Sequence, residues 1–137
     1  MTIDYLKTQK IIHWLMAIII MLDLNVAQKF GGNMELWDRL ESRADHATAG
    51  MIVTFLFILR VALRYVYGAP KLPPTMPTWQ VISAKLGHYS LYFLMAGLII
   101  TGISMASFAS DPIIVFGIDL AFAVHNQNTF FIIRGFH

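Results

Sequence analysis

Three long apolar runs dominate this sequence of 137 residues and leave few folds open to it. They cover residues 9–28, 46–67 and 86–108, and the third run contains no charged side chain. A helix of about 20 apolar residues, rising about 1.5 Å per residue, crosses the ~30 Å hydrocarbon core of a bilayer. Only 13% of the residues are charged, about half the share of a typical soluble domain. We therefore predict an all-α membrane protein with three transmembrane helices in a single membrane domain, residues 1–137.

The segments around these runs have a different character. The first run could belong to a cleaved signal peptide, but no clear small-residue cleavage site follows it, so we read an uncleaved helix. The segment after the second run is rich in proline, which excludes a regular helix there. Residues 109–137 alternate short apolar patches with polar ones. We predict an outer loop and tail with short helical or interfacial pieces.

The positions of Lys and Arg predict how the chain sits in the membrane, because cytoplasmic loops are enriched in these residues. With the N-terminus inside, the inner group is Lys7, Lys10, Arg60, Arg64, Lys71 and Lys85, and the outer group is Lys29, Arg39, Arg43 and Arg134. We predict a multi-pass protein of the bacterial inner (cell) membrane with a cytoplasmic N-terminus, surrounded by membrane lipid. The net charge of +2 gives no reason to expect nucleic acid as a partner.

Histidines are the most informative polar residues, since cysteine is absent and iron–sulfur clusters are excluded. His13, His46 and His88 stand near the start of the three runs. One histidine at a membrane boundary is unremarkable, but three suggest a function, because ionisable groups in spans are costly. Neutral imidazole commonly binds haem iron and other metals. The topology puts His13 and His46 at opposite faces, so two separate centres would form a path for electrons.

The neighbours of these histidines allow more than one interpretation. Gly50 follows His46 by one turn, where it would let a flat macrocycle lie against the helix or would make a helix–helix contact. Arg60 and Arg64 could pair with haem propionates or simply anchor their helix at the inner face. Gly97 and Gly102 suggest close helix contacts in the third run.

Several short motifs, taken in order, resemble the bacterial cytochrome b561 family, which is related to the b-type cytochrome subunits of nickel-iron hydrogenases and formate dehydrogenases. The first is Tyr5-Leu-Lys-Thr-Gln-Lys-Ile-Ile-His13-Trp14-Leu15. The later ones are His46-Ala-Thr-Ala-Gly50, Arg60 with Arg64 and the proline-rich loop after them, Leu86-Gly87-His88 with Leu91-Tyr92, and Pro112 with Phe116-Gly117. The resemblance covers essentially the whole chain, and the order and spacing of the motifs make it specific.

The resemblance implies a four-helix bundle that holds two haem b groups and transfers electrons between the quinone pool and a donor or acceptor on the periplasmic side. The family's ligands match His13 and His46, and His137 matches the first of two ligands on the fourth helix. His46 and His137 would then bind the outer haem. The sequence ends at His137, so we expect three helices with the fourth absent. That leaves the inner haem in question.

Some roles stay open at this stage. His88 would lie near the quinone or the inner haem, or it would replace the missing ligand opposite His13. His125 is expected to be a solvated surface residue, and a histidine at the last position of the sequence would be poorly held. Three helices would leave one side of the haem sites facing lipid, which a homodimer would close.

The leading hypothesis is an electron carrier rather than an enzyme; as an enzyme it would be a quinone-linked oxidoreductase. Two alternatives remain. One is a membrane anchor or cytochrome subunit of a larger redox complex. The other is a non-haem metal carrier that uses histidine and methionine.

Overall fold

The computed structural model describes residues 7–28, 35–68, 74–123 and 125–137. Lys29, Lys71 and the Tyr5 end of the first motif lie outside these ranges. The elements in chain order are α1 (Lys7–Gln28), α2 (Leu36–Tyr67), α3 (Thr78–Ser107), β1 (Ile114–Val115), β2 (Ile118–Asp119) and α4 (Gln127–Arg134). Three helices are long and apolar enough to cross a membrane. The predicted all-α membrane protein with three transmembrane helices is thereby confirmed.

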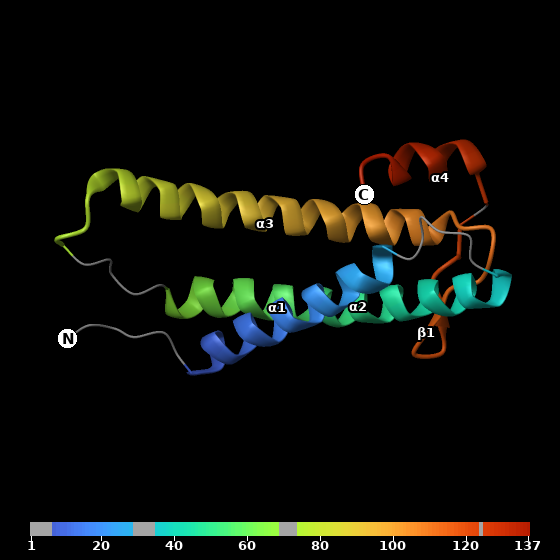
Figure 1. Ribbon diagram of the computed structural model, residues 1–137, viewed down its shortest axis with the longest axis horizontal. Helices are drawn as coiled ribbons and strands as arrows, with labels where there is room; N and C mark the ends of the chain where they lie inside the picture. Colours follow the sequence, from blue (N-terminus) through green and yellow to red (C-terminus); the bar gives the residue numbers. More distant parts are fainter. Residues whose placement is uncertain (1–6, 29–34, 69–73, 124) are drawn as a thin grey trace.

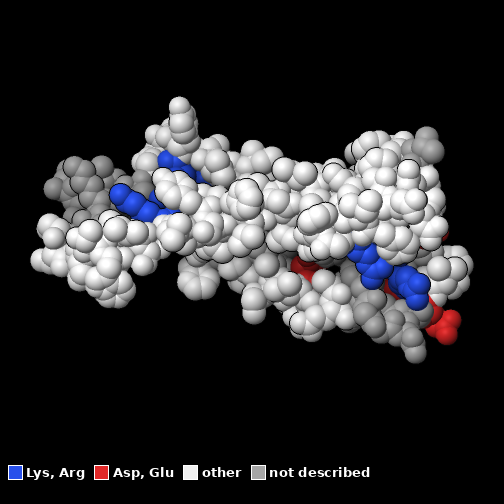
Figure 2. Space-filling view, turned by 90° about the horizontal axis from the view of Figure 1, so that it is seen from above, with Lys and Arg blue, Asp and Glu red and all other residues white. Residues whose placement is uncertain are grey.

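The three long helices lie roughly side by side and alternate in direction (Figure 1). We call the end where α1 and α3 begin the Lys7 end, and the end that carries the hairpin and α4 the α4 end. In Figure 2, acidic side chains are visible only in the half toward the α4 end, whereas Lys and Arg occur near both ends. The uncharged surface between the two ends has the character of a lipid-facing belt.

The helices begin earlier than the apolar runs predicted. α2 starts at Leu36 instead of residue 46, α3 at Thr78 instead of 86, and α1 at Lys7 instead of 9. Helix formation needs backbone hydrogen bonds and not apolar side chains, so polar turns continue a helix beyond the hydrocarbon core. His46 and His88 therefore lie about three turns inside their helices instead of at their first residues.

The best-packed interface joins α1 to α2. Its buried residues are Ile12, Met16, Val53 and Leu56. α3 is attached more loosely, through Met95 and through the ring of Tyr92, whose centre lies 6.1 Å from that of Phe57. Most other large apolar side chains of the long helices are exposed. Water could not cover this surface at low cost, whereas lipid can.

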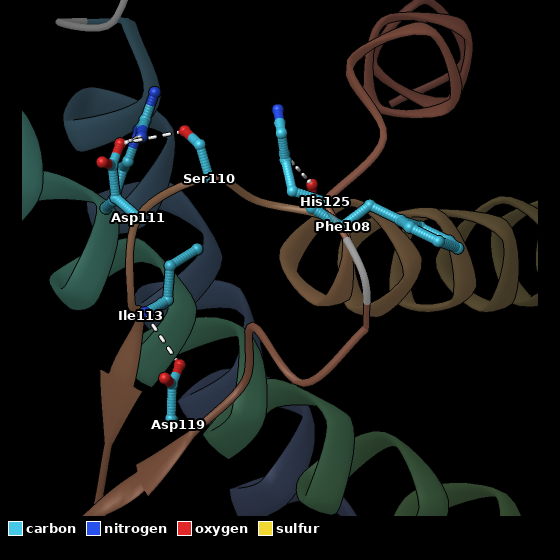
Figure 3. A network of polar contacts seen from close by, with 7 residues as sticks. Phe108, Ser110, Asp111, Ile113, Asp119 and His125 are labelled. Atoms are coloured by element: carbon cyan, nitrogen blue, oxygen red, sulfur yellow. Dashed lines mark hydrogen bonds and ion pairs between the residues drawn. The ribbon is translucent and has the colours of Figure 1, made fainter.

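A two-stranded antiparallel hairpin follows α3, and its turn is formed by Phe116 and Gly117 with φ of 51° and 80°. Positive φ at both central residues is typical of a type I′ hairpin turn. Val115 is almost fully buried, 1% exposed, on a strand that contacts α2. The Asp119 carboxylate accepts hydrogen bonds from the N–H groups of Ile113 (3.2 Å) and Ala121 (2.9 Å). Figure 3 shows the first of these bonds.

The chain then returns to the end of α3 and is fastened there. The N–H of Ala123 donates to the Ser107 carbonyl at 3.1 Å. Figure 3 shows the second bond, in which Nδ1 of His125 donates to the Phe108 carbonyl at 2.9 Å. His125 is exposed, as predicted. The Asn126 side chain accepts the N–H of Thr129 at 3.1 Å and begins α4. α4 therefore lies beside the last part of α3 (Figure 1).

We expect Met16→Ala to destabilise the protein by about 1–3 kcal/mol, because the cavity left between α1 and α2 loses packing contacts. Met21→Ala is the matched control: both methionines lie on α1, but Met16 is 6% exposed and Met21 is 65% exposed. Thermal unfolding in detergent measures both variants. Equal losses of stability would contradict the packing described for α1 and α2.

Candidate functional site

Two histidines meet at the α4 end, one from α2 and one just beyond α4. The ring centres of His46 and His137 lie 6.0 Å apart, and the ring planes make an angle of 77°. A metal atom bound by one nitrogen of each ring, with bonds of about 2 Å, would put the ring centres about 6 Å apart. The observed spacing therefore fits one metal atom held between the two imidazoles.

The protonation of His46 follows from its partner on α1. Nδ1 of His46 lies 2.9 Å from Oδ1 of Asp23. A carboxylate can only accept a hydrogen bond, so the shared proton belongs to Nδ1 of the imidazole. In a neutral ring, Nε2 is then the unprotonated nitrogen, which is the form that binds a metal.

The ring of His137 is oriented in the same way by α3. Its Nδ1 lies 2.9 Å from the hydroxyl of Thr101, and that hydroxyl donates its one proton to the Gly97 carbonyl at 2.8 Å. Thr101 must therefore accept from Nδ1–H, which leaves Nε2 of His137 unprotonated. Partial burial is the largest cause that lowers the pKa of His137, and the neighbouring His46 is the second. Asp23 and a backbone hydrogen bond at Leu98 act in the opposite direction and raise this pKa. The net effect favours the neutral ring at physiological pH.

The His137 ring packs against Gly102, where the lack of a side chain leaves room for it; we call this contact the seat of the ring. A Cβ atom built on Gly102 would lie 3.0 Å from Cε1 of His137, a distance that side chains rarely adopt. The expected poor anchoring of His137 is therefore wrong, because Thr101 and Gly102 hold its ring. A Cβ on Gly97 would meet no described atom within 4 Å, so its predicted helix contact is absent among the described residues. The same is true of Gly50, where a Cβ would also meet no described atom within 4 Å.

A second candidate site lies at the Lys7 end. A partly open pocket of about 160 Å³ is lined by Gln9, Lys10, His13, Arg60, Arg64, His88 and Tyr92. The structure thus brings together four residues that the sequence had singled out separately: His13, Arg60, Arg64 and His88. Nδ1 of His88 donates to the Ala84 carbonyl at 2.7 Å, so in the neutral ring Nε2 is the unprotonated nitrogen. The pocket combines imidazole nitrogens with three cationic side chains.

The two sites lie apart along the helices. His13 belongs to the pocket, whereas Asp23 contacts His46 at the other site. Ten residues of helix separate His13 from Asp23, which corresponds to roughly 15 Å along the axis. His13 and His46 therefore cannot bind the same metal atom, as their positions in the sequence predicted.

Asp23, Thr101, Gln9 and Tyr92 were not among the predicted site residues, although Gln9 and Tyr92 lie within the motifs that resemble the cytochrome b561 family. Asp23 had a usable signal, because it is the only acidic residue of α1 and interrupts an apolar run. The Gln9 amide donates to the Leu63 carbonyl at 3.3 Å, across the α1–α2 interface. Thr101 carried no such signal, since hydroxyl side chains are common in membrane helices.

The donor set bears on the kind of group that fits. Within the described parts of the chain, no three His, Asp or Glu side chains come together as they would around a bare metal ion. Two imidazoles with ring centres 6.0 Å apart suit a haem, since the macrocycle itself would supply the remaining ligands of the iron. The pair formed by His46 and His137 therefore fits a bis-histidine haem better than a transported metal ion.

Gly102→Ala is expected to displace the His137 ring, because the new methyl group would lie 3.0 Å from Cε1. The bond to Thr101 would weaken, and the imidazole ¹⁵N resonances of His137 would shift toward a mixture of tautomers in NMR spectra. Gly97→Ala, where nothing described lies within 4 Å, is the control and should leave these resonances in place. Unchanged resonances in both variants would contradict the seat assigned to Gly102.

Comparison with known protein families adds one finding. A family model described as prokaryotic cytochrome b561 matches residues 4–137, nearly the full length of the chain.

Proposed function

The chain belongs to the prokaryotic cytochrome b561 family, and from this premise we propose that it carries electrons between the quinone pool and a redox partner on the periplasmic side. The family makes it a multi-pass membrane b-type cytochrome that takes part in electron transfer. Haem, when bound, supplies reversible one-electron chemistry. The observation that supports the proposal most directly is the pair of imidazoles with ring centres 6.0 Å apart.

In this proposal His46 and His137 are the two residues that would hold a haem at the α4 end. Asp23 and Thr101 keep the protons on the two Nδ1 atoms, so each ring offers Nε2 to the iron. The hairpin and the bonds at the end of α3 set the position of α4, and with it that of His137. The protein therefore supplies two oriented ligands before the cofactor arrives.

The Lys7 end would hold the second centre. His13 is the proposed ligand there, and Arg60, Arg64 and Lys10 would bind carboxylates such as haem propionates. His88, on the loosely attached α3, would be the second ligand or would bind the quinone head group through its unprotonated Nε2. Quinol oxidation releases two electrons and two protons. The chain would accept these electrons one at a time.

The charges support an orientation with the Lys7 end in the cytoplasm of a cell bounded by an inner membrane. The described Lys and Arg residues in the half toward the Lys7 end are Lys7, Lys10, Arg60, Arg64 and Lys85, and those toward the α4 end are Arg39, Arg43 and Arg134. The positive-inside rule then places the pair of His46 and His137 near the periplasmic face. Electrons would cross the bilayer between the two sites.

We expect the purified chain, in detergent and with adequate haem supply, to show low-spin b-type bands in its reduced-minus-oxidised absorption spectrum. His46→Ala and His137→Ala should each remove the haem at the α4 end, because one remaining imidazole cannot form a bis-histidine site. Met21→Ala is the control, since this side chain is 65% exposed on α1 and belongs to neither site. A well-folded but colourless protein would overturn the haem assignment.

Haem quantitation on two further variants distinguishes the roles at the Lys7 end. If His13 is a ligand, His13→Ala should lower the haem content of the purified protein while the component lost in His46→Ala remains. His88→Ala should cause the same loss only if His88 is the opposite ligand. If His88 binds quinone, this variant should keep its haem and lose reduction by added quinol. A haem content unchanged in His13→Ala would remove the second centre from the proposal.

A further inference from the structure

We infer that Asp23 is a positioning residue that lowers the reduction potential of the haem at the α4 end through its hydrogen bond to His46. This inference rests on the proposed function, because it assumes that His46 is a haem ligand. Asp23 does not approach the iron in this account. It acts only through the imidazole whose Nδ1 lies 2.9 Å from its carboxylate.

The position of Asp23 is unusual for an acidic residue. It lies within the apolar part of α1 and is the only Asp or Glu of that helix. Its side chain is only 17% exposed, and that of His46 is 28% exposed. Acidic side chains inside membrane spans are costly and are usually turned toward a polar partner within the protein. The partner found here for Asp23 is the proposed ligand.

The packing of α1 against α2 holds this contact in place. Ile12, Met16, Val53 and Leu56 form the buried part of that interface, and Ile19 and Ile20 extend it toward Asp23. The buried cluster itself contains neither Asp23 nor His46. The apolar packing therefore fixes the two helix backbones between which the hydrogen bond forms.

The chemistry of the hydrogen bond gives the direction of the effect. An anionic acceptor on Nδ1–H increases the electron density of the ring and makes Nε2 a stronger donor to the metal. It also places a negative charge near the iron in a region of low dielectric constant. Both effects favour the ferric state, which carries one more positive charge than the ferrous state. Removing the charge should therefore raise the reduction potential.

The two ligands of this site are not equivalent. His46 donates to a carboxylate, whereas His137 donates to a hydroxyl whose own proton is bonded to the Gly97 carbonyl. Hydrogen bonds to ionised acceptors are roughly twice as strong as those between neutral groups. The electronic influence of the protein should therefore reach the iron mainly through His46, and Asp23 is its source.

The test is a spectroscopic redox titration of the haem-loaded protein and of the Asp23→Asn variant, which keeps the side-chain size and loses the charge. The titration follows the part of the haem absorption that disappears in the His46→Ala variant. We expect the ratio of reduced to oxidised haem at a given potential to rise about tenfold, which corresponds to about +59 mV for a one-electron couple. Asp45→Asn is the matched control, because Asp45 is an exposed neighbour of His46 and loses the same charge.

Each outcome is decisive. A rise confined to Asp23→Asn supports the inference, whereas equal shifts in both variants or no shift in either would overturn it. If Asp23→Asn does not retain the haem, the Asp23→Glu variant is measured instead. Haem binding at the original reduction potential in Asp23→Glu supports the inference. A failure of Asp23→Glu to restore haem binding counts against the inference. If the unaltered chain binds no haem, or keeps all of it in His46→Ala, the proposed function fails instead.

Discussion

The antiparallel packing of α1 against α2 is the interaction on which both sites depend. It joins Ile12 and Met16 to Val53 and Leu56, and it sets the register between the two helices. In that register, His13 lies beside Arg60 and Arg64 at one end, while Asp23 meets His46 at the other. A shift of one residue would turn either pair apart, because neighbouring positions on a helix point about 100° away from each other.

The return of the chain beside α3 completes the site at the α4 end. His137 is far from His46 in sequence and follows the short helix α4. Two hydrogen bonds turn the chain back, one from the Ala123 N–H to the Ser107 carbonyl and one from the His125 side chain to the Phe108 carbonyl. The ion pair between Arg43 and Asp111 (3.2 Å) ties the same loop to α2. Gly102 then leaves the space that the imidazole fills. This site therefore requires all four helices.

Much of this architecture could be predicted from the sequence, because lipid imposes simple rules on apolar runs. Length and hydropathy identify a membrane helix, so the three long helices and the separation of His13 from His46 followed directly. The start of α2 at Leu36 did not follow, since a helix extends past the bilayer wherever its backbone can be satisfied. The tail was harder still, because its hairpin and α4 depend on contacts with α3.

The partners of the histidines were the least predictable part of the site. A sequence shows that an imidazole is present, but its tautomer depends on which acceptor the fold brings to Nδ1. For His46 this acceptor comes from another helix, and for His137 it is one hydroxyl among many. Asp23 could have been suspected from the sequence, because burying an acidic side chain in the membrane costs free energy unless it has a polar partner. The register of α1 and α2 decides which histidine Asp23 contacts. The packing that forms the bundle therefore also selects His46 as the proposed ligand that is hydrogen-bonded to a carboxylate.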